Sequence, residues 1–215
     1  MKAFVSWSGG KDCMLALHRF LQNKENEVFC LLNMCDEHEE HSGSHELPAY
    51  IIRRQAEAMN VPVRQQKTPK KQYEQQLKAV IAELKIQGVT AGVFGDIYLE
   101  AHRVWIERVC AEAGITPVFP LWGDDTKKLL AEFIDAGFDS LTVAVRENML
   151  PESWLGRKLD NAFLNEISAL NGIDACGEMG EYHSFVYDGP LFSHAVEFST
   201  GNRHRANNHI YLEIK

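Results

Sequence analysis

Residues 8–13 read Ser8-Gly9-Gly10-Lys11-Asp12-Cys13 and join a short apolar run, Ala3–Trp7, to a segment with helical periodicity. Two glycines let backbone N–H groups approach an anion closely, and the start of a helix adds a partial positive charge. Lys11 adds a full charge. The loop matches neither Gly-x-x-x-x-Gly-Lys-Ser/Thr nor Gly-x-Gly-x-x-Gly. It predicts a phosphate-binding loop; the alternative is a tight turn that leaves Lys11 exposed.

Apolar runs alternate with helical stripes over the first 146 residues. A helix whose stripe includes Leu77 and Leu84 is expected to stop at Gly88, as a C-terminal glycine would make it do. Strands separated by helices of this length favour parallel pairing, so the fold class is α/β with a doubly wound, mainly parallel sheet. Ligands on such sheets lie at the carboxyl ends of the strands. The expected strands are residues 3–7, 28–34, a run opening at 61–63, 92–96, 116–119 and 138–145.

The pattern changes after residue 146. A helix is expected around Phe163 and Ile167, followed by three strands rich in aromatic and β-branched residues at 182–187, 195–200 and 209–214. Asp188-Gly189-Pro190 and Gly201-Asn202 are expected to break these strands. We therefore predict two domains, residues 1–146 as a nucleotide-binding domain and residues 147–215 as a small α+β domain that binds the second substrate.

Composition excludes several classes of protein. The chain has 215 residues, 45% hydrophobic and 24% charged, which is ordinary for a globular protein and unlike a disordered one. A net charge of −8 argues against general attraction to a nucleic-acid backbone. No apolar run approaches the roughly 18 residues of a membrane helix, and no signal peptide is evident. Five cysteines without Cys-x-x-Cys suggest no disulfide framework and favour a reducing cytoplasm.

The hexapeptide resembles the Ser-Gly-Gly-Lys-Asp-Ser loop of the PP-loop ATP pyrophosphatases, which have a HUP-like fold and cleave ATP between the α and β phosphates. Nearly the whole chain resembles the diphthine–ammonia ligase family and its uncharacterised ATP-binding relatives. A second shared motif is Gly95-Asp96-Ile97, with His102-Arg103 and Pro120-Leu121-Trp122 after it. The third and most specific motif is residues 176–185, Cys-Gly-Glu-Met-Gly-Glu-Tyr-His-Ser-Phe, followed by residues 188–192, Asp-Gly-Pro-Leu-Phe.

Three positions depart from that family's pattern. Cys13 replaces the serine that usually ends the loop, Met179 stands where glycine is common, and Ser184 where threonine is. A thiol is a weaker hydrogen-bonding group than a hydroxyl, so a phosphate contact from Cys13 is in doubt. Met179 adds bulk beside the third motif and points to an altered choice of substrate.

The resemblance implies a set of nucleotide-binding residues. Ser8, Gly9, Gly10, Lys11 and Asp12 would bind the ATP phosphates, with Gly95 nearby. Asn33 and Met34 would lie beside adenine, although Met34 is equally compatible with the core. Asp12 would hold Mg²⁺, because hard cations prefer carboxylates and substrate phosphates; a first-turn helix carboxylate is the alternative. His45 borders the nucleotide in the family. The surrounding His-rich stretch, residues 36–45, invites a zinc interpretation, but a solvated acidic loop is favoured.

A second set of residues is expected to serve the acceptor and the metal. Asp96 would end its strand and bind Mg²⁺ or a substrate amine, with capping of the next helix as the alternative. Glu178, Glu181 and His183 would bind or deprotonate an amine; the alternative is an exposed acidic hairpin. The two glutamates are expected to raise the pKa of His183. Cys110 is expected in the core and Cys176 near the site.

The resemblance implies an ATP-dependent amide ligase that adenylates a carboxylate, releases pyrophosphate and amidates the acyl-adenylate with ammonia. In that family the acceptor is diphthine on translation elongation factor 2; a small acid is the other option. The catalytic residues would be Lys11, Asp12, Asp96, Glu178, Glu181 and His183, and the cofactors ATP and Mg²⁺. The alternatives are adenylation for sulfur transfer or tRNA modification, and a non-catalytic nucleotide-binding protein. We expect no nucleic-acid or membrane partner, and leave a homodimer open.

Overall fold

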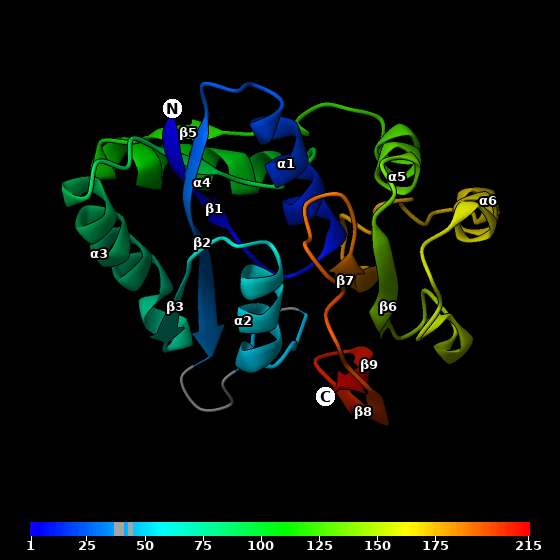
Figure 1. The fold of residues 1–215 in the computed structure, drawn as a ribbon. Coiled ribbons are helices and arrows are strands. Elements are labelled where there is room, and N and C mark those ends of the chain that lie inside the picture. The colour runs from blue at the N-terminus through cyan, green and yellow to red at the C-terminus, as the bar shows by residue number, and fades with distance from the viewer. Residues whose placement is uncertain (37–40, 43–44) are drawn as a thin grey trace.

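Five parallel strands form the first sheet of the computed structural model, which describes residues 1–36, 41–42 and 45–215. Their spatial order is β3-β2-β1-β4-β5, so the chain reverses direction across the sheet between β1 and β4 (Figure 1). The strands are β1 (Lys2–Ser6), β2 (Glu27–Asp36), β3 (Val63–Thr68), β4 (Ala91–Val93) and β5 (Thr116–Val118). The predicted α/β class with a doubly wound parallel sheet is confirmed.

Helices cover both faces of this sheet. Alternation along β1 sends Ala3 and Val5 to the face covered by α1 (Lys11–Leu21) and α2 (Ala49–Ala58). Phe4 points to the other face, where α3 (Tyr73–Ile86) and α4 (Glu100–Ala113) pack. The expected stop of α3 is confirmed, because Gly88 follows it with a φ of 85°. Because α1 starts at Lys11, shortly after β1 ends at Ser6, its first turn lies at the carboxyl edge of the sheet.

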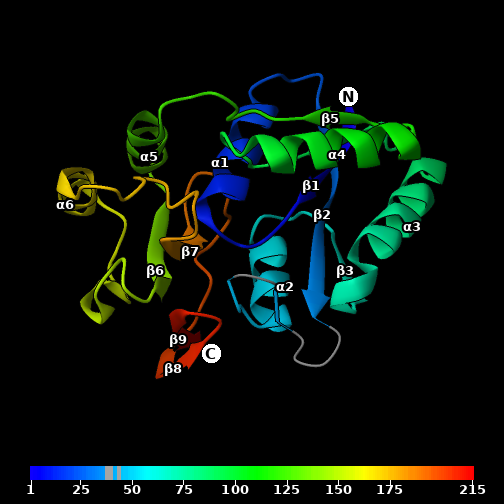
Figure 2. The ribbon, with the colours of Figure 1, turned by 180° about the vertical axis from the view of Figure 1, so that it is seen from behind.

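A second, antiparallel sheet has the order β7-β6-β9-β8, with α5 (Thr126–Asp135) and α6 (Asn161–Ala169) beside it (Figure 2). Its strands are β6 (Asp139–Arg146), β7 (Tyr182–Asp188), β8 (Thr200–Ala206) and β9 (His209–Ile214). Short 3₁₀ turns occur at Lys70–Gln72 and Glu152–Trp154. The expectation that residues 138–145 complete the parallel sheet is wrong, since β6 pairs with β7 and β9. An apolar run suits the centre of either sheet and does not specify its neighbours.

The strand predicted at residues 195–200 is also misplaced. β8 begins at Thr200 and runs through Gly201-Asn202, the dipeptide that was expected to break it. An irregular register between Thr200 and Arg203 accommodates the glycine inside the strand. The tight turn lies instead at Asn207 and Asn208, which both have positive φ, 50° and 62°, as a two-residue hairpin turn requires.

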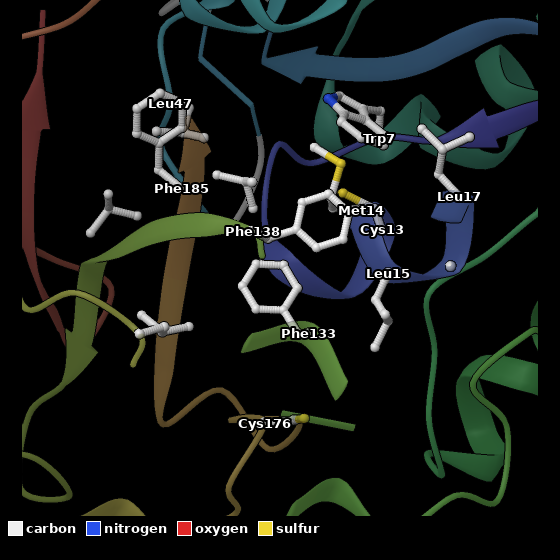
Figure 3. Packing of buried hydrophobic residues seen from close by; sticks show 14 of the residues in the cluster. Trp7, Cys13, Met14, Leu15, Leu17, Leu47, Phe133, Phe138, Cys176 and Phe185 are labelled. Atoms are coloured by element: carbon white, nitrogen blue, oxygen red, sulfur yellow. The ribbon is translucent and has the colours of Figure 1, made fainter. Parts of the chain in front are cut away.

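One hydrophobic cluster joins the two sheets. Trp7 and Met14 from the first sheet and α1 belong to the same cluster as Phe133, Phe138 and Phe185 (Figure 3). Packing does not separate residues 1–146 from 147–215, and that division stays a prediction. Among the described residues no helix combines the length and apolar character needed to cross a bilayer.

Candidate active site

The glycine loop after β1 is supported from behind by β7 and α2. The Gly9 carbonyl accepts hydrogen bonds from the Val186 N–H at 3.1 Å and from Gln55 Nε2 at 2.9 Å. Gln55 is fully buried and also donates to the Val186 carbonyl at 2.6 Å. Gly9 has a φ of +86°, and a Cβ there would lie 2.7–2.9 Å from Ile52, Leu47 and Gln55. Only glycine fits this backbone conformation and this space.

Lys11 lies behind the loop rather than in the open. Its backbone N–H donates to Ser184 Oγ at 3.1 Å, and its amine contacts the Cys176 carbonyl and lies 2.9 Å from Asp12 Oδ2. The side chain is 4% exposed, so the alternative of an exposed lysine is wrong. Burial is the largest influence and opposes the charge, but Asp12, Tyr182 and Cys176 together outweigh it and hold the pKa of Lys11 well above its ordinary value. Lys11 is therefore a protonated, internally paired cation.

A cavity of about 730 Å³ opens beside this loop at the carboxyl ends of β1, β2 and β4. It brings together most of the predicted site residues: Ser8, Asp12, Asn33, Met34, His45, Gly95, Asp96, Glu178 and His183. Gly9, Gly10, Lys11 and Glu181 were predicted as site residues but are not among the described residues that line it. The cavity thus joins residues from both halves of the chain, as a site with two substrates would require.

Three carboxylates line the cavity and form what we call the acidic cluster: Asp12, Asp96 and Glu178. Glu178 Oε1 accepts a hydrogen bond from the Ile97 N–H at 2.9 Å. Burial nevertheless raises the pKa of Glu178 to about 7, with the charges of Asp12 and Asp96 adding to the effect. Glu178 can therefore both hold and release a proton near neutral pH.

Asp96 lies beyond the end of β4 at Val93 rather than ending that strand. The N-cap of α4 is Leu99 without a side-chain bond, so the alternative that Asp96 caps this helix is wrong. Its Oδ1 lies 3.3 Å from His102 Nδ1 instead. Burial raises the pKa of Asp96, while His102 opposes the shift. In the described part of the chain, no three His, Cys, Asp or Glu side chains converge as a ready metal site.

Four described histidines line the cavity, and three of them form the basic cluster together with a guanidinium: His45, Arg146, His183 and His209. The ring of His183 lies 4.7 Å from that of His45 and 5.5 Å from that of His209, centroid to centroid. His45 Nδ1 lies 2.9 Å from the Ser184 carbonyl, and its ring fills the space beside Gly10, where a Cβ would lie 2.3 Å from Cε1. These contacts tie the basic cluster to the glycine loop.

Two imidazoles of the basic cluster, those of His45 and His183, are held neutral. Burial lowers the pKa of His45 to about 4. Burial and the imidazoles of His45 and His209 hold the pKa of His183 well below its ordinary value. The expectation that the glutamates raise the pKa of His183 is wrong, because imidazoles and cations, not carboxylates, dominate its surroundings.

Glu181 is buried and stabilises a turn instead of lining the cavity. It is 2% exposed, and its Oε1 accepts the Asp174 N–H at 3.0 Å. Asp174 Oδ1 in turn accepts the N–H groups of Cys176 and Glu178 at 2.9 and 3.1 Å. Glu181 and Asp174 thereby shape the turn that carries Glu178, so the alternative of an exposed acidic hairpin does not describe Glu181.

Asn33 and Met34, the two residues predicted to lie beside adenine, have different surroundings. The Asn33 side chain is already engaged, donating to the Trp7 carbonyl at 2.8 Å and accepting from Gln65 Nε2 at 3.2 Å. Met34 is half-buried and lines the cavity, so its side chain faces the site as well as the core. The Cys13 thiol, which stands where the family usually has a serine hydroxyl, donates to the Gly10 carbonyl at 3.1 Å. This contact gives Cys13 a structural role in the loop.

Sequence reasoning missed several cavity residues. Arg146 and His209 face each other across β6 and β9, and only that pairing brings them to the cavity. Tyr73, the first residue of α3, is 40% exposed and lines the cavity, and it was not predicted as a site residue. Cys110 is fully buried, as predicted, and Cys176 is buried with its carbonyl on Lys11. Of the His-rich stretch, residues 37–40 and 43–44 lie outside the described part, so the zinc interpretation is untested there.

Comparisons with known proteins agree with this arrangement. The family model described as "Diphthamide synthase N-terminal domain" matches residues 1–117, and "Diphthamide synthase C-terminal domain" matches residues 125–215. A Danio rerio protein named diphthine–ammonia ligase is 35% identical over 125 residues, 57% of this chain and 48% of the relative. The Homo sapiens protein of that name is 32% identical over 123 residues, 56% and 45% of the two chains.

A Schizosaccharomyces pombe protein of the same name is 26% identical over an alignment that covers 100% of this chain and 39% of the relative. The chain spans about half the length, or less, of the curated relatives it matches. The two family models together cover both sheets and both residue clusters of the cavity. The chain therefore belongs to the diphthamide synthase family.

Proposed function

We propose that this chain is an ATP-dependent ligase that adenylates a substrate carboxylate and converts it to an amide with ammonia. The observation that carries the proposal is the single cavity in which Ser8 and Asp12, at the start of α1, meet Glu178 from the C-terminal half. A helix start suits a phosphate, and a carboxyl group that titrates near neutral pH suits an amine. The names of the relatives support the same reaction and do not favour sulfur transfer or tRNA modification.

The reaction has two balanced steps. A carboxylate oxygen attacks the α-phosphorus of ATP and forms an O–P bond, while the bond from the α-phosphorus to the bridging oxygen breaks and pyrophosphate leaves with the electron pair. Ammonia then attacks the acyl carbon, forms the C–N bond and displaces AMP. The nitrogen loses a proton in this second step. Glu178, with a pKa of about 7, is the group in the acidic cluster suited to accept it.

The remaining cavity residues bind and orient the substrates. The N-terminal end of α1 and Ser8 would hold the phosphates, with Gly95 close to the first turn, since a Cβ there would lie 2.9 Å from the Cys13 nitrogen. Asn33 and Met34 would border adenine. His45 and His183, uncharged at neutral pH, would accept or donate hydrogen bonds without adding charge. Lys11 would act through Asp12 and Cys176 rather than by touching ATP.

Mg²⁺ would fit the acidic cluster. Carboxylate oxygens are the ligands it prefers, and Asp12 and Asp96 both line the cavity, where burial makes their charge costly. The ion would supply charge neutralisation for the triphosphate. A carboxylic acid is the proposed acceptor, diphthine-like or small, in a cytoplasmic protein that needs no nucleic-acid or membrane partner. A homodimer remains one proposed oligomeric state.

Product analysis tests the proposal. The full-length protein is incubated with ATP, ammonium and a panel of carboxylic acids that includes diphthine on elongation factor 2, and nucleotides are separated by chromatography. AMP and pyrophosphate that form only with an acceptor support the ligase, whereas ADP and phosphate contradict it. Asp96→Asn is expected to lower AMP formation at least about tenfold. The exposed Asp135→Asn serves as the matched control and is expected to behave as wild type.

A further inference from the structure

Arg146 stands at a junction of the second sheet and the cavity. It is the last residue of β6, pairs with His209 in the register with β9, and lines the cavity. Its backbone N–H donates to the Glu181 carbonyl at 2.8 Å. A Cβ built on Gly180 would lie 3.5 Å from Nη2, so the guanidinium lies against the turn that carries Glu178.

Within the described residues, the guanidinium of Arg146 has no carboxylate partner. Among these residues, the contact recorded for it is Met149 Sδ at 3.9 Å from Nη1. Other arginines of this acidic chain are engaged: Arg19 with Asp124 and Glu132, Arg108 with Glu74 and Glu112, and Arg157 with Glu166. An arginine beside a cavity that keeps all five donors free of a carboxylate is suited to bind an anion from outside the chain.

Arg146 is also the permanent charge of the basic cluster. Burial keeps His45 and His183 uncharged at neutral pH, and the charge of Arg146 also lowers the pKa of His183. Lys11, the other cation near the loop, is paired with Asp12 and the Cys176 carbonyl. The cation that the sequence predicts to meet the polyphosphate is therefore engaged elsewhere, whereas Arg146 has no carboxylate partner among the residues that the structure describes.

We infer that Arg146 binds the β- and γ-phosphates of ATP, the part of the nucleotide that leaves as pyrophosphate. The planar guanidinium matches phosphate oxygens in pairs and remains charged at every working pH. Charge accumulates on these phosphates as the bond to the α-phosphorus breaks, so a fixed cation there favours the transition state. The inference rests on the proposed function, because it assigns one end of the ATP molecule to one residue of the proposed site.

The test compares three ligands in calorimetric titrations of the full-length protein. Arg146→Met removes the charge and keeps an unbranched apolar side chain, whereas Arg146→Lys keeps a point charge. The affinities for ATP and for pyrophosphate should fall at least about tenfold in Arg146→Met, and Arg146→Lys should recover part of the loss. AMP, which lacks these phosphates, should bind within about twofold of wild type. Arg53→Met, at an exposed arginine on α2, is the matched control.

Two results would overturn the inference. One is ATP and pyrophosphate binding by Arg146→Met equal to that of wild type. The other is an equal loss of AMP affinity, which would place the effect on the adenosine half or on folding. The wild-type product assay reads the proposed function separately. Absence of AMP there would defeat the ligase proposal, while the titrations would still decide whether Arg146 binds the terminal phosphates.

Discussion

The acidic cluster and the basic cluster line one cavity but respond to burial in opposite directions. Burial raises the pKa of Glu178 to about 7 and lowers that of His45 to about 4. Both shifts move a group toward its neutral form at pH 7, as expected wherever charge loses contact with water. The acidic cluster is thereby left able to exchange a proton, while the basic cluster keeps one permanent charge, on Arg146. We therefore propose that the acidic cluster transfers a proton and that the basic cluster binds an anion.

The largest effect is expected at the ion pair behind the acidic cluster. Lys11→Met should lower the free energy of unfolding by about 3 kcal/mol, because it leaves the Asp12 carboxylate and the Cys176 carbonyl without their cation. Denaturant titration at pH 7 measures the change. Lys24→Met, at an exposed lysine, should stay within about 0.5 kcal/mol of wild type. If Lys11→Met keeps the stability of wild type and loses only affinity for ATP, Lys11 binds the ATP phosphates directly and the structural role is wrong.

The next effect concerns the division of roles. Glu178→Gln should lower kcat at least about 100-fold and leave the Kd for ATP within about threefold, since it removes a proton acceptor and not a phosphate ligand. The wild-type rate should rise with pH through about 7, as Glu178 ionises, and this limb should vanish in the variant. Steady-state kinetics and calorimetry measure the two quantities, with the exposed Glu57→Gln as control. If Glu178→Gln lost turnover and ATP binding equally, the acidic cluster would also bind ATP, and the division of roles between the two clusters would be wrong.

The smallest effect tests the basic cluster through stability. The pKa of His45 is about 4 in the folded chain and about 6.5 in the unfolded chain. Between these two pH values His45 is protonated in the unfolded chain and neutral in the folded chain, so stability falls as the pH is lowered. Wild type should therefore lose about 2 kcal/mol more than His45→Gln as pH falls from 7 to 4.5. Thermal or denaturant unfolding at the two values measures this. The exposed His194→Gln is the control and should lose as much stability at low pH as wild type. If His45→Gln also lost as much stability as wild type, the proposed effect of burial on His45 would be wrong.

The parallel sheet was predictable because its signals are local. Apolar runs, helical stripes and Gly88 each act within a few residues, and the strand ends they define place Ser8, Asp12 and Asn33 at one edge. Motif resemblance added Asp96, Glu178 and His183, which also line the cavity.

What sequence reasoning missed depends on pairing between distant segments. Arg146 reaches the cavity because β6 pairs with β9, and the apolar run of β6 carries no mark of that partner. Lys11 was expected to bind the ATP phosphates, because nothing nearby in sequence shows that the Cys176 carbonyl lies within reach of its amine. Glu181 looked like a second acid until its contact with the Asp174 N–H placed it inside a turn. Local patterns define elements, whereas the direction of a side chain depends on what packs against it.

The support of the glycine loop by β7 has a consequence for how the protein can be made. Lys11 and Ser184, which join loop and strand, are 173 positions apart, and the Gly9 carbonyl depends on Val186 in the same way. During synthesis the N-terminal sheet can pair its strands long before these partners emerge, so the loop acquires its final hydrogen bonds only when nearly the whole chain is available. A fragment that ends with the first family-model match at residue 117 would contain every loop residue and none of the strand that holds it. The proposed nucleotide site is therefore not expected to form in a fragment of the first 117 residues alone.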